Sequence, residues 1–72
     1  MDELQKRLDA LYDSIDPELL DELTIHDDFT VGVSTVEHNG IHIAKMTGVT
    51  PVNAIAAHIW LLKKAVQYLE TL

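Results

Sequence analysis

With 72 residues, no cysteine and a net charge of −7, the chain falls outside several classes of protein. A chain this short forms one domain, residues 1–72, and without cysteine it can hold neither a disulfide nor a thiolate metal site. Its acidic balance argues against direct binding to nucleic acid or to anionic membranes, because both need clustered Lys and Arg.

The apolar residues are not arranged as in a secreted or membrane-spanning protein. Charged residues alternate with leucine through residues 1–15, where a secretory segment would have an unbroken apolar run. The longest uncharged run, Met46 to Leu62, is 17 residues long, contains Pro51 and is at the lower limit for a bilayer span. We therefore expect a cytoplasmic protein without membrane contact.

Acidic residues are concentrated in residues 1–28, which hold ten of the twelve. The only bases in this segment are Lys6 and Arg7, whereas residues 29–72 are nearly neutral. Such an asymmetry predicts a partner with positive charge.

Two helices are predicted within this acidic segment. The first runs from about Asp2 to Ser14, because its apolar residues recur at intervals of three and four: Leu4, Leu8, Leu11 and Ile15. Asp16 is then predicted to be the N-cap of a short second helix, with Pro17 at its first position. We expect this second helix to end near Thr24, which makes residues 1–28 an acidic helical segment.

Residues 29–46 are predicted to form a β-hairpin. Asn39-Gly40 is typical of a two-residue type I′ turn, in which both central residues take a positive φ. The turn pairs the following residues across the strands: His38 with Ile41, Glu37 with His42, and Val36 with Ile43. A bulge near Ser34-Thr35 would bring the valines onto one face. The expected core face is Val31, Val33, Val36, Ile41 and Ile43.

A long C-terminal helix is predicted within residues 50–72. Thr50-Pro51 repeats the cap-then-proline signal, so the helix should run from Pro51 to about Thr71. It carries two apolar stripes. The first consists of Val52, Ile55, Ile59, Leu62, Val66 and Leu69. The second consists of Ala54, His58, Leu61, Ala65, Tyr68 and Leu72.

Two interpretations of the second stripe are open. A chain of this length has little material to cover both stripes, so the second stripe is interpreted as the interface of a homo-oligomer, most simply a dimer. Alternatively, the N-terminal helices cover one stripe and the hairpin covers the other. Trp60 lies on the otherwise polar side, either as an interface anchor or as a cap on the edge of the core.

The predicted fold class is α+β, in a small domain of order α-α-β-β-α. A two-stranded antiparallel hairpin packs against the N-terminal helices and the long C-terminal helix. The order of helix, tight hairpin and long helix resembles that of small phage head–tail joining proteins, which would imply a structural assembly subunit. The resemblance is topological and transfers no site residue.

Neither an active site nor a cofactor or metal site is predicted. Glycine-rich phosphate loops, His-Glu-x-x-His motifs and nucleophile elbows are all missing from the sequence. The run His26-Asp27-Asp28 offers possible metal ligands, but adjacent residues rarely converge on one ion. His58 lies within an apolar stripe, either as a satisfied core or interface residue or as a pH-sensitive group.

The function expected from these features is that of a small acidic protein-binding module that occupies a basic surface, such as one that normally holds nucleic acid. Phage-encoded inhibitors, anti-CRISPR proteins among them, are often small, acidic and free of cysteine. The alternatives are a virion assembly subunit and an oligomer that sequesters a small ligand. The candidate partner-binding residues are Asp9, Asp13, Asp21, Glu22, Asp27 and Asp28.

Overall fold

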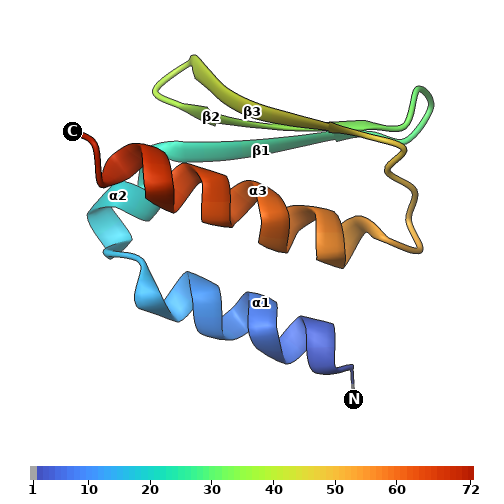
Figure 1. Cartoon of the computed structure of the whole chain (residues 1–72), viewed down its shortest axis with the longest axis horizontal. Coiled ribbons are helices and arrows are strands. Elements are labelled where there is room, and N and C mark those ends of the chain that lie inside the picture. Colours follow the sequence, from blue (N-terminus) through green and yellow to red (C-terminus); the bar gives the residue numbers. More distant parts are fainter. Residues whose placement is uncertain (1) are drawn as a thin grey trace.

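Six elements arranged in three layers make up the computed structural model, which describes residues 2–72 (Figure 1). They are α1 (Glu3–Ser14), α2 (Pro17–Asp21), β1 (Leu23–Asp28), β2 (Val33–His38), β3 (Ile41–Thr47) and α3 (Ala54–Leu69). The mixed α+β class and the long C-terminal helix predicted from the sequence are confirmed. No helix within residues 2–72 is long and apolar enough to cross a membrane.

The middle layer is α3, with the sheet on one side of it and α1 on the other (Figure 1). In the figure α1 and α3 run in the same direction, and the short α2 turns the chain from α1 into the sheet. The strand order is β1-β2-β3, and both pairs are antiparallel.

Both N-terminal helices begin at the residues that the sequence indicates. The Asp2 carboxylate accepts a hydrogen bond from the Leu4 backbone N–H at 3.0 Å, and Asp16 accepts one from Glu18 at 2.9 Å. These carboxylates satisfy N–H groups that have no partner within the helix, and Pro17 follows Asp16 at a position where a missing N–H costs nothing.

The acidic segment is not helical throughout, because its last residues form a strand. This strand pairs with the predicted two-stranded hairpin and extends it to a three-stranded sheet. The second helix ends at Asp21, and Leu23–Asp28 forms an edge strand against β2, so the sheet has three strands. Leu23-Thr24-Ile25 alternates apolar and polar residues, and the two β-branched residues favour a strand. The acidic residues beyond Ile25 are tolerated because an edge strand is exposed to water.

The predicted turn at Asn39-Gly40 is confirmed, with φ values of 51° and 83°. His38 faces Ile41 and Glu37 faces His42 as expected, but Val36 faces Ala44 instead of Ile43. The irregularity responsible for this shift lies between Val36 and Glu37, not at Ser34-Thr35.

Because there is no bulge at Ser34-Thr35, side chains alternate strictly between the two faces of the sheet along β2. The residues on the core face therefore differ from those predicted. Ser34, Val36 and His38 are buried, whereas Val33 lies on the opposite face and is half-buried. Val31 and Ile41 are 68% and 57% exposed, so their assignment to the core was wrong. Ile43 does pack near Val36, as predicted.

The C-terminal helix begins three residues later than expected. Residues 51–53 form a turn, and the Asn53 side chain holds that turn instead of capping the helix. Its Oδ1 accepts from the Thr50 N–H at 2.8 Å, and its Nδ2 donates to the Gly48 carbonyl at 3.1 Å. Val52 therefore lies outside the first stripe and is 96% exposed.

Both stripes of α3 are covered within the single chain. Leu62 packs with Leu8 and Ile15 beneath α1, and Leu61 and Ala65 pack with Val36 beneath the sheet. The premise that 72 residues cannot cover both stripes was wrong, because β1 widens the sheet.

The second stripe is therefore core instead of a free interface along most of its length. Leu61 and Ala65 are fully buried, and Ala54, His58 and Tyr68 are half-buried. Only Leu72, beyond the helix, is largely exposed. Trp60 is 39% exposed, and the Lys64 ammonium lies 5.3 Å from its ring centre.

Replacing Gly40 by Val should lower the free energy of unfolding by about 1 kcal/mol or more, because a β-branched residue is strained at positive φ. A Cβ at this position would meet no atom within 4 Å, so the loss would come from the backbone alone. Urea denaturation measures it. Thr47→Val, which places the same residue at an exposed strand position, is the control, and an equal effect of both variants would contradict the turn.

Leu61→Glu should unfold the chain instead of yielding a folded monomer, since Leu61 is completely buried and a carboxylate there has no ion-pair partner. Circular dichroism and sedimentation velocity together report the outcome. Lys64→Glu, on the exposed side of the same helix, should keep the wild-type spectrum. A folded, monomeric Leu61→Glu protein would show that this part of α3 is an interface.

Candidate functional site

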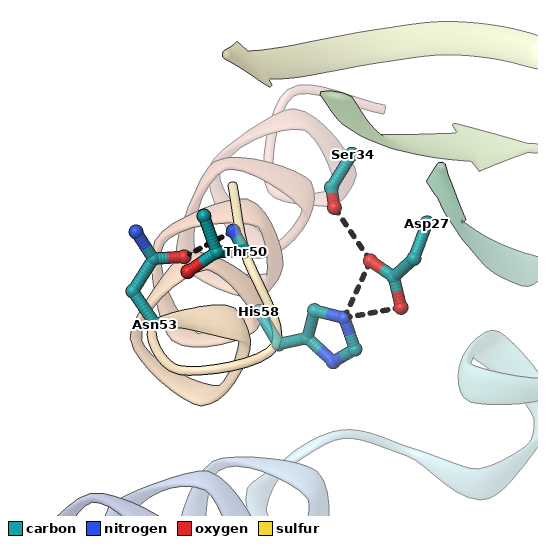
Figure 2. A network of polar contacts seen from close by, with 5 residues as sticks. All are labelled: Asp27, Ser34, Thr50, Asn53 and His58. Atoms are coloured by element: carbon teal, nitrogen blue, oxygen red, sulfur yellow. Dashed lines mark hydrogen bonds and ion pairs between the residues drawn. The ribbon is translucent and has the colours of Figure 1, made fainter. Parts of the chain in front are cut away.

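The most connected polar cluster lies where β1, β2 and α3 meet (Figure 2). The Asp27 carboxylate accepts a hydrogen bond from the Ser34 hydroxyl at 2.5 Å and lies 2.9 Å from the His58 Nε2 through each of its oxygens. Ser34 is fully buried, whereas the side chains of Asp27 and His58 are 25% and 22% exposed. The three side chains thus join two strands and the middle layer.

Local structure explains why these three residues meet. Asp27 is the third inward position of β1, after Leu23 and Ile25, and it pairs directly with Ser34 in the sheet register. The alternation that buries the two apolar side chains therefore also turns a carboxylate toward α3. His58 lies one turn before Leu61 on the side of α3 that faces the sheet, where it meets that carboxylate.

The surroundings of Asp27 keep it ionised. Burial raises the pKa of its carboxyl group, but the hydrogen bonds from Ser34 and His58 and the electrostatic effect of the nearby His58 and His26 rings together outweigh burial, so the pKa is lowered overall. On α1, burial and then the Asp27 charge raise the pKa of Tyr12. The electrostatic effect of the Asp27 carboxylate thus extends to α1.

The order of the groups in this cluster is unsuited to nucleophilic catalysis. In a catalytic triad the histidine lies between the nucleophile and the carboxylate and takes the proton of the nucleophile. Here the carboxylate lies between Ser34 and His58, and the Ser34 hydroxyl donates a hydrogen bond to it. The arrangement orders β1 against α3 and does not activate the buried serine.

A second histidine–carboxylate pair lies at the other end of β1. His38 is 8% exposed, and its Nε2 lies 2.9 Å from Glu22 Oε1. Its ring packs at 5.5 Å from that of Tyr68 on α3, at a tilt of 58°. The Asn39 N–H also donates to the Glu22 carbonyl, so this pair anchors the hairpin turn to the end of α2.

Of the remaining histidines, His26 and His42 lie on the sheet face away from α3. His26 Nε2 lies 3.7 Å from Glu37, whereas His42 is opposite Glu37 in the register. His26 and Asp27 point to opposite faces, so the run His26-Asp27-Asp28 does not converge on one ion. Within residues 2–72 no group of three or more metal-ligating side chains is close enough to hold a metal.

The six candidate partner-binding acids divide into two groups. The carboxylates of Glu22 and Asp27 already contact His38 and His58 within the chain, so we do not expect them to contact a partner. Asp9, Asp13, Asp21 and Asp28 are exposed. Asp9 accepts from the Gln5 amide at 3.0 Å, and Asp28 accepts from the Thr30 N–H at 3.0 Å in the turn after β1.

An apolar groove of about 490 Å³ lies between α1 and α3 and is open to solvent. We call it the α1–α3 groove. Its apolar and small lining residues are Leu4, Ala10, Leu11, Ser14, Ala56 and Ile59. Its two charged lining residues are Arg7, from α1, and Lys63, from α3. Nothing in the sequence pattern singled out this groove, because its residues come from two helices more than 40 positions apart.

No family model, curated protein sequence or solved structure matches this chain.

The internal role of Asp27 was missed because the strand that contains it was missed. The available signal was the alternation of Leu23-Thr24-Ile25, which extends to Asp27 at the next inward position. The sequence marks His58 as a polar residue in an apolar stripe. In the structure it is a histidine whose hydrogen bond is satisfied within the protein, by the Asp27 carboxylate 31 residues away.

Asp27→Asn should lower the free energy of unfolding by about 1 kcal/mol near neutral pH, because a charge-assisted hydrogen bond is lost at a partly solvated site. The native pKa of Asp27 is lower than that of a free aspartate, so its stabilising effect is complete above the pKa of the unfolded chain and is lost as the pH falls through the native pKa. The difference between wild type and variant should therefore shrink from about pH 5 toward pH 2.

Urea denaturation at several pH values measures this difference. Asp28→Asn is the control, since Asp28 is exposed and an amide oxygen can also accept from Thr30. A wild-type-minus-Asp27→Asn difference that stays constant across this range would contradict the assignment.

Proposed function

We propose that this chain is a protein-binding module whose exposed carboxylates on α1 and α2 contact a basic surface of another protein. The supporting observation is that these carboxylates form no ion pair among residues 2–72. The ion pairs within residues 2–72 involve only Glu22, Asp27 and Glu37, each with a histidine. Asp9, Asp13 and Asp21 are exposed and have no cationic partner within ion-pair distance among the described residues.

Unpaired surface charge of one sign repels itself and adds nothing to the stability of the fold. It does accelerate encounter with a surface of opposite charge and reject surfaces of like charge. Carboxylates spread over two helices suit an extended basic surface better than a single small cation. A protein surface that normally holds nucleic acid has this character, and occupying it would make the chain an inhibitor of nucleic-acid binding.

The polar clusters of the sheet support binding over catalysis. The Asp27 and Glu22 carboxylates hold histidines in structural contacts, and the only hydroxyl in the first cluster is buried. These contacts join the sheet to α3 and to the end of α2.

Neutralising Asp9, Asp13 and Asp21 together, each to Asn, should slow association with a basic surface and flatten its salt dependence. Stopped-flow mixing with a fluorescent 20-residue oligolysine supplies the probe, and each lost charge contact should reduce the rate by a factor of about two to five at low salt. Circular dichroism should show an unchanged fold, because exposed substitutions rarely change stability by more than about 0.5 kcal/mol.

The control makes the same change of charge elsewhere, with Asp28→Asn, Glu37→Gln and Glu70→Gln in one chain. If net charge alone attracts the probe, both triple variants will associate with it at equally reduced rates. That result would show that the assignment of the binding surface to α1 and α2 is wrong. A DNA-displacement assay tests whether the chain acts as an inhibitor. The wild-type chain should displace DNA from the partner, and the variant with Asn at positions 9, 13 and 21 should do so more weakly.

A further inference from the structure

The α1–α3 groove differs in character from the acidic surface of the same molecule. Leu4, Leu11 and Ile59 supply apolar surface, and Ala10 and Ala56 keep side chains from filling the space. The groove lies on the side of α1 that carries Arg7, whereas Asp9 and Asp13 project from another side of this helix, given 100° per residue. One helix thus separates an apolar, cationic groove from an acidic flank.

The two cations that line the groove have no carboxylate partner. Among residues 2–72, neither Arg7 nor Lys63 lies within ion-pair distance of an acidic side chain, although the chain has twelve acids and only five bases. One cation comes from each of the two helices that form the groove. An occupant that complements this site therefore presents an apolar stripe with negative charge beside it.

The dimensions and openness of the groove favour a helix over an acyl chain. From Leu4 to Ser14 the α1 wall is about 15 Å long at 1.5 Å per residue, which matches about three turns of a helix. An acyl chain in an open groove would leave one side exposed to water. A helix carries its own polar outer face and needs only its apolar stripe covered.

A second copy of this chain is a poor occupant, because Leu8, Ile15 and Leu62 are buried in one core and are not available for contact. The stripe residues left at the surface, Leu4, Leu11 and Ile59, line the groove itself beside Arg7 and Lys63. Two copies meeting through these residues would bring like charges together. The occupant that remains is a helix from a different protein.

We propose that the α1–α3 groove binds an amphipathic helix of a partner protein, one whose apolar stripe is flanked on both sides by Asp or Glu. The apolar residues would recur at i, i+3 or i+4, and i+7, and the flanking carboxylates would meet Arg7 on one side and Lys63 on the other. This surface is separate from the exposed carboxylates of the proposed function, and either can fail without the other.

The test begins with selection from a displayed library of 16-residue helical peptides on the full-length chain. We expect enrichment of peptides with an apolar stripe flanked by acids. One enriched peptide, labelled with fluorescein, is then titrated with the wild-type chain, and its scrambled version and a version with Lys for each acid are the peptide controls. The expected result is that both control peptides bind at least tenfold more weakly.

Two protein variants with the same charge change locate the site. Arg7→Glu with Lys63→Glu should weaken binding about tenfold or more, which corresponds to the loss of two charge contacts. Lys6→Glu with Lys64→Glu changes exposed neighbours outside the groove lining and should change binding less than threefold. Ala56→Trp, which places an indole at the exposed edge of the groove, should abolish binding at any salt concentration while circular dichroism stays unchanged.

Several outcomes would overturn the proposal. They are enrichment of basic or non-amphipathic peptides, equal losses in the two double variants, or full binding by Ala56→Trp. Self-association of the wild-type chain that disappears in Ala56→Trp would assign the groove to a second copy. Displacement of the peptide by laurate at lower concentration than by unlabelled peptide would assign it to an acyl ligand.

Discussion

The structure depends on covering α3 from both sides. A helix with apolar residues around most of its circumference cannot face water on either stripe, and here the sheet covers Leu61 and Ala65 while α1 covers Leu62. Each outer layer is therefore held mainly by its contact with the middle helix. In this 72-residue chain without cysteine, one helix therefore contributes to two cores.

The edge strand β1 is the element that makes this covering possible, and polar contacts hold it in place. Asp27 binds His58 at one end of the strand, and Glu22, beside the other end, binds His38. Hydrogen bonds to an ionised carboxylate are stronger than those between neutral groups, so these contacts reinforce the packing of the strand. Among the ten acids of residues 1–28, Glu22 and Asp27 thus contact histidines, whereas Asp2 and Asp16 cap helices.

The two proposed surfaces have opposite electrostatic character although α1 contributes to both. Asp9, Asp13 and Asp21 are exposed and have no ion-pair partner among residues 2–72, whereas Arg7 and Lys63 both line the groove. A molecule of this kind could bring together a basic protein surface and an acidic amphipathic helix. The separation arises from helix geometry, because residues two positions apart, such as Arg7 and Asp9, are about 200° apart around the axis.

Local signals in the sequence determined the starts of the first two helices, the hairpin turn and the two stripes of the long helix. Asp2, Asp16 and Asn39-Gly40 act through hydrogen bonds and backbone angles within a few residues, so their effects need no tertiary partner. The delayed start of α3 shows the limit of this reasoning, since Asn53 bonds backward to Gly48 and Thr50 where a cap was expected at Thr50.

Only the tertiary structure decided which surfaces remain free. Whether the second stripe of α3 is core or interface depends on the width of the sheet, and that width depends on β1, whose acidic composition hid its strand character. The groove between α1 and α3, the pairing of Asp27 with His58 and the exposure of Ile41 all join or separate residues that are distant in sequence. Periodicity records which side chains share a face of one element, but burial is settled by the neighbours that the folded chain brings to that face.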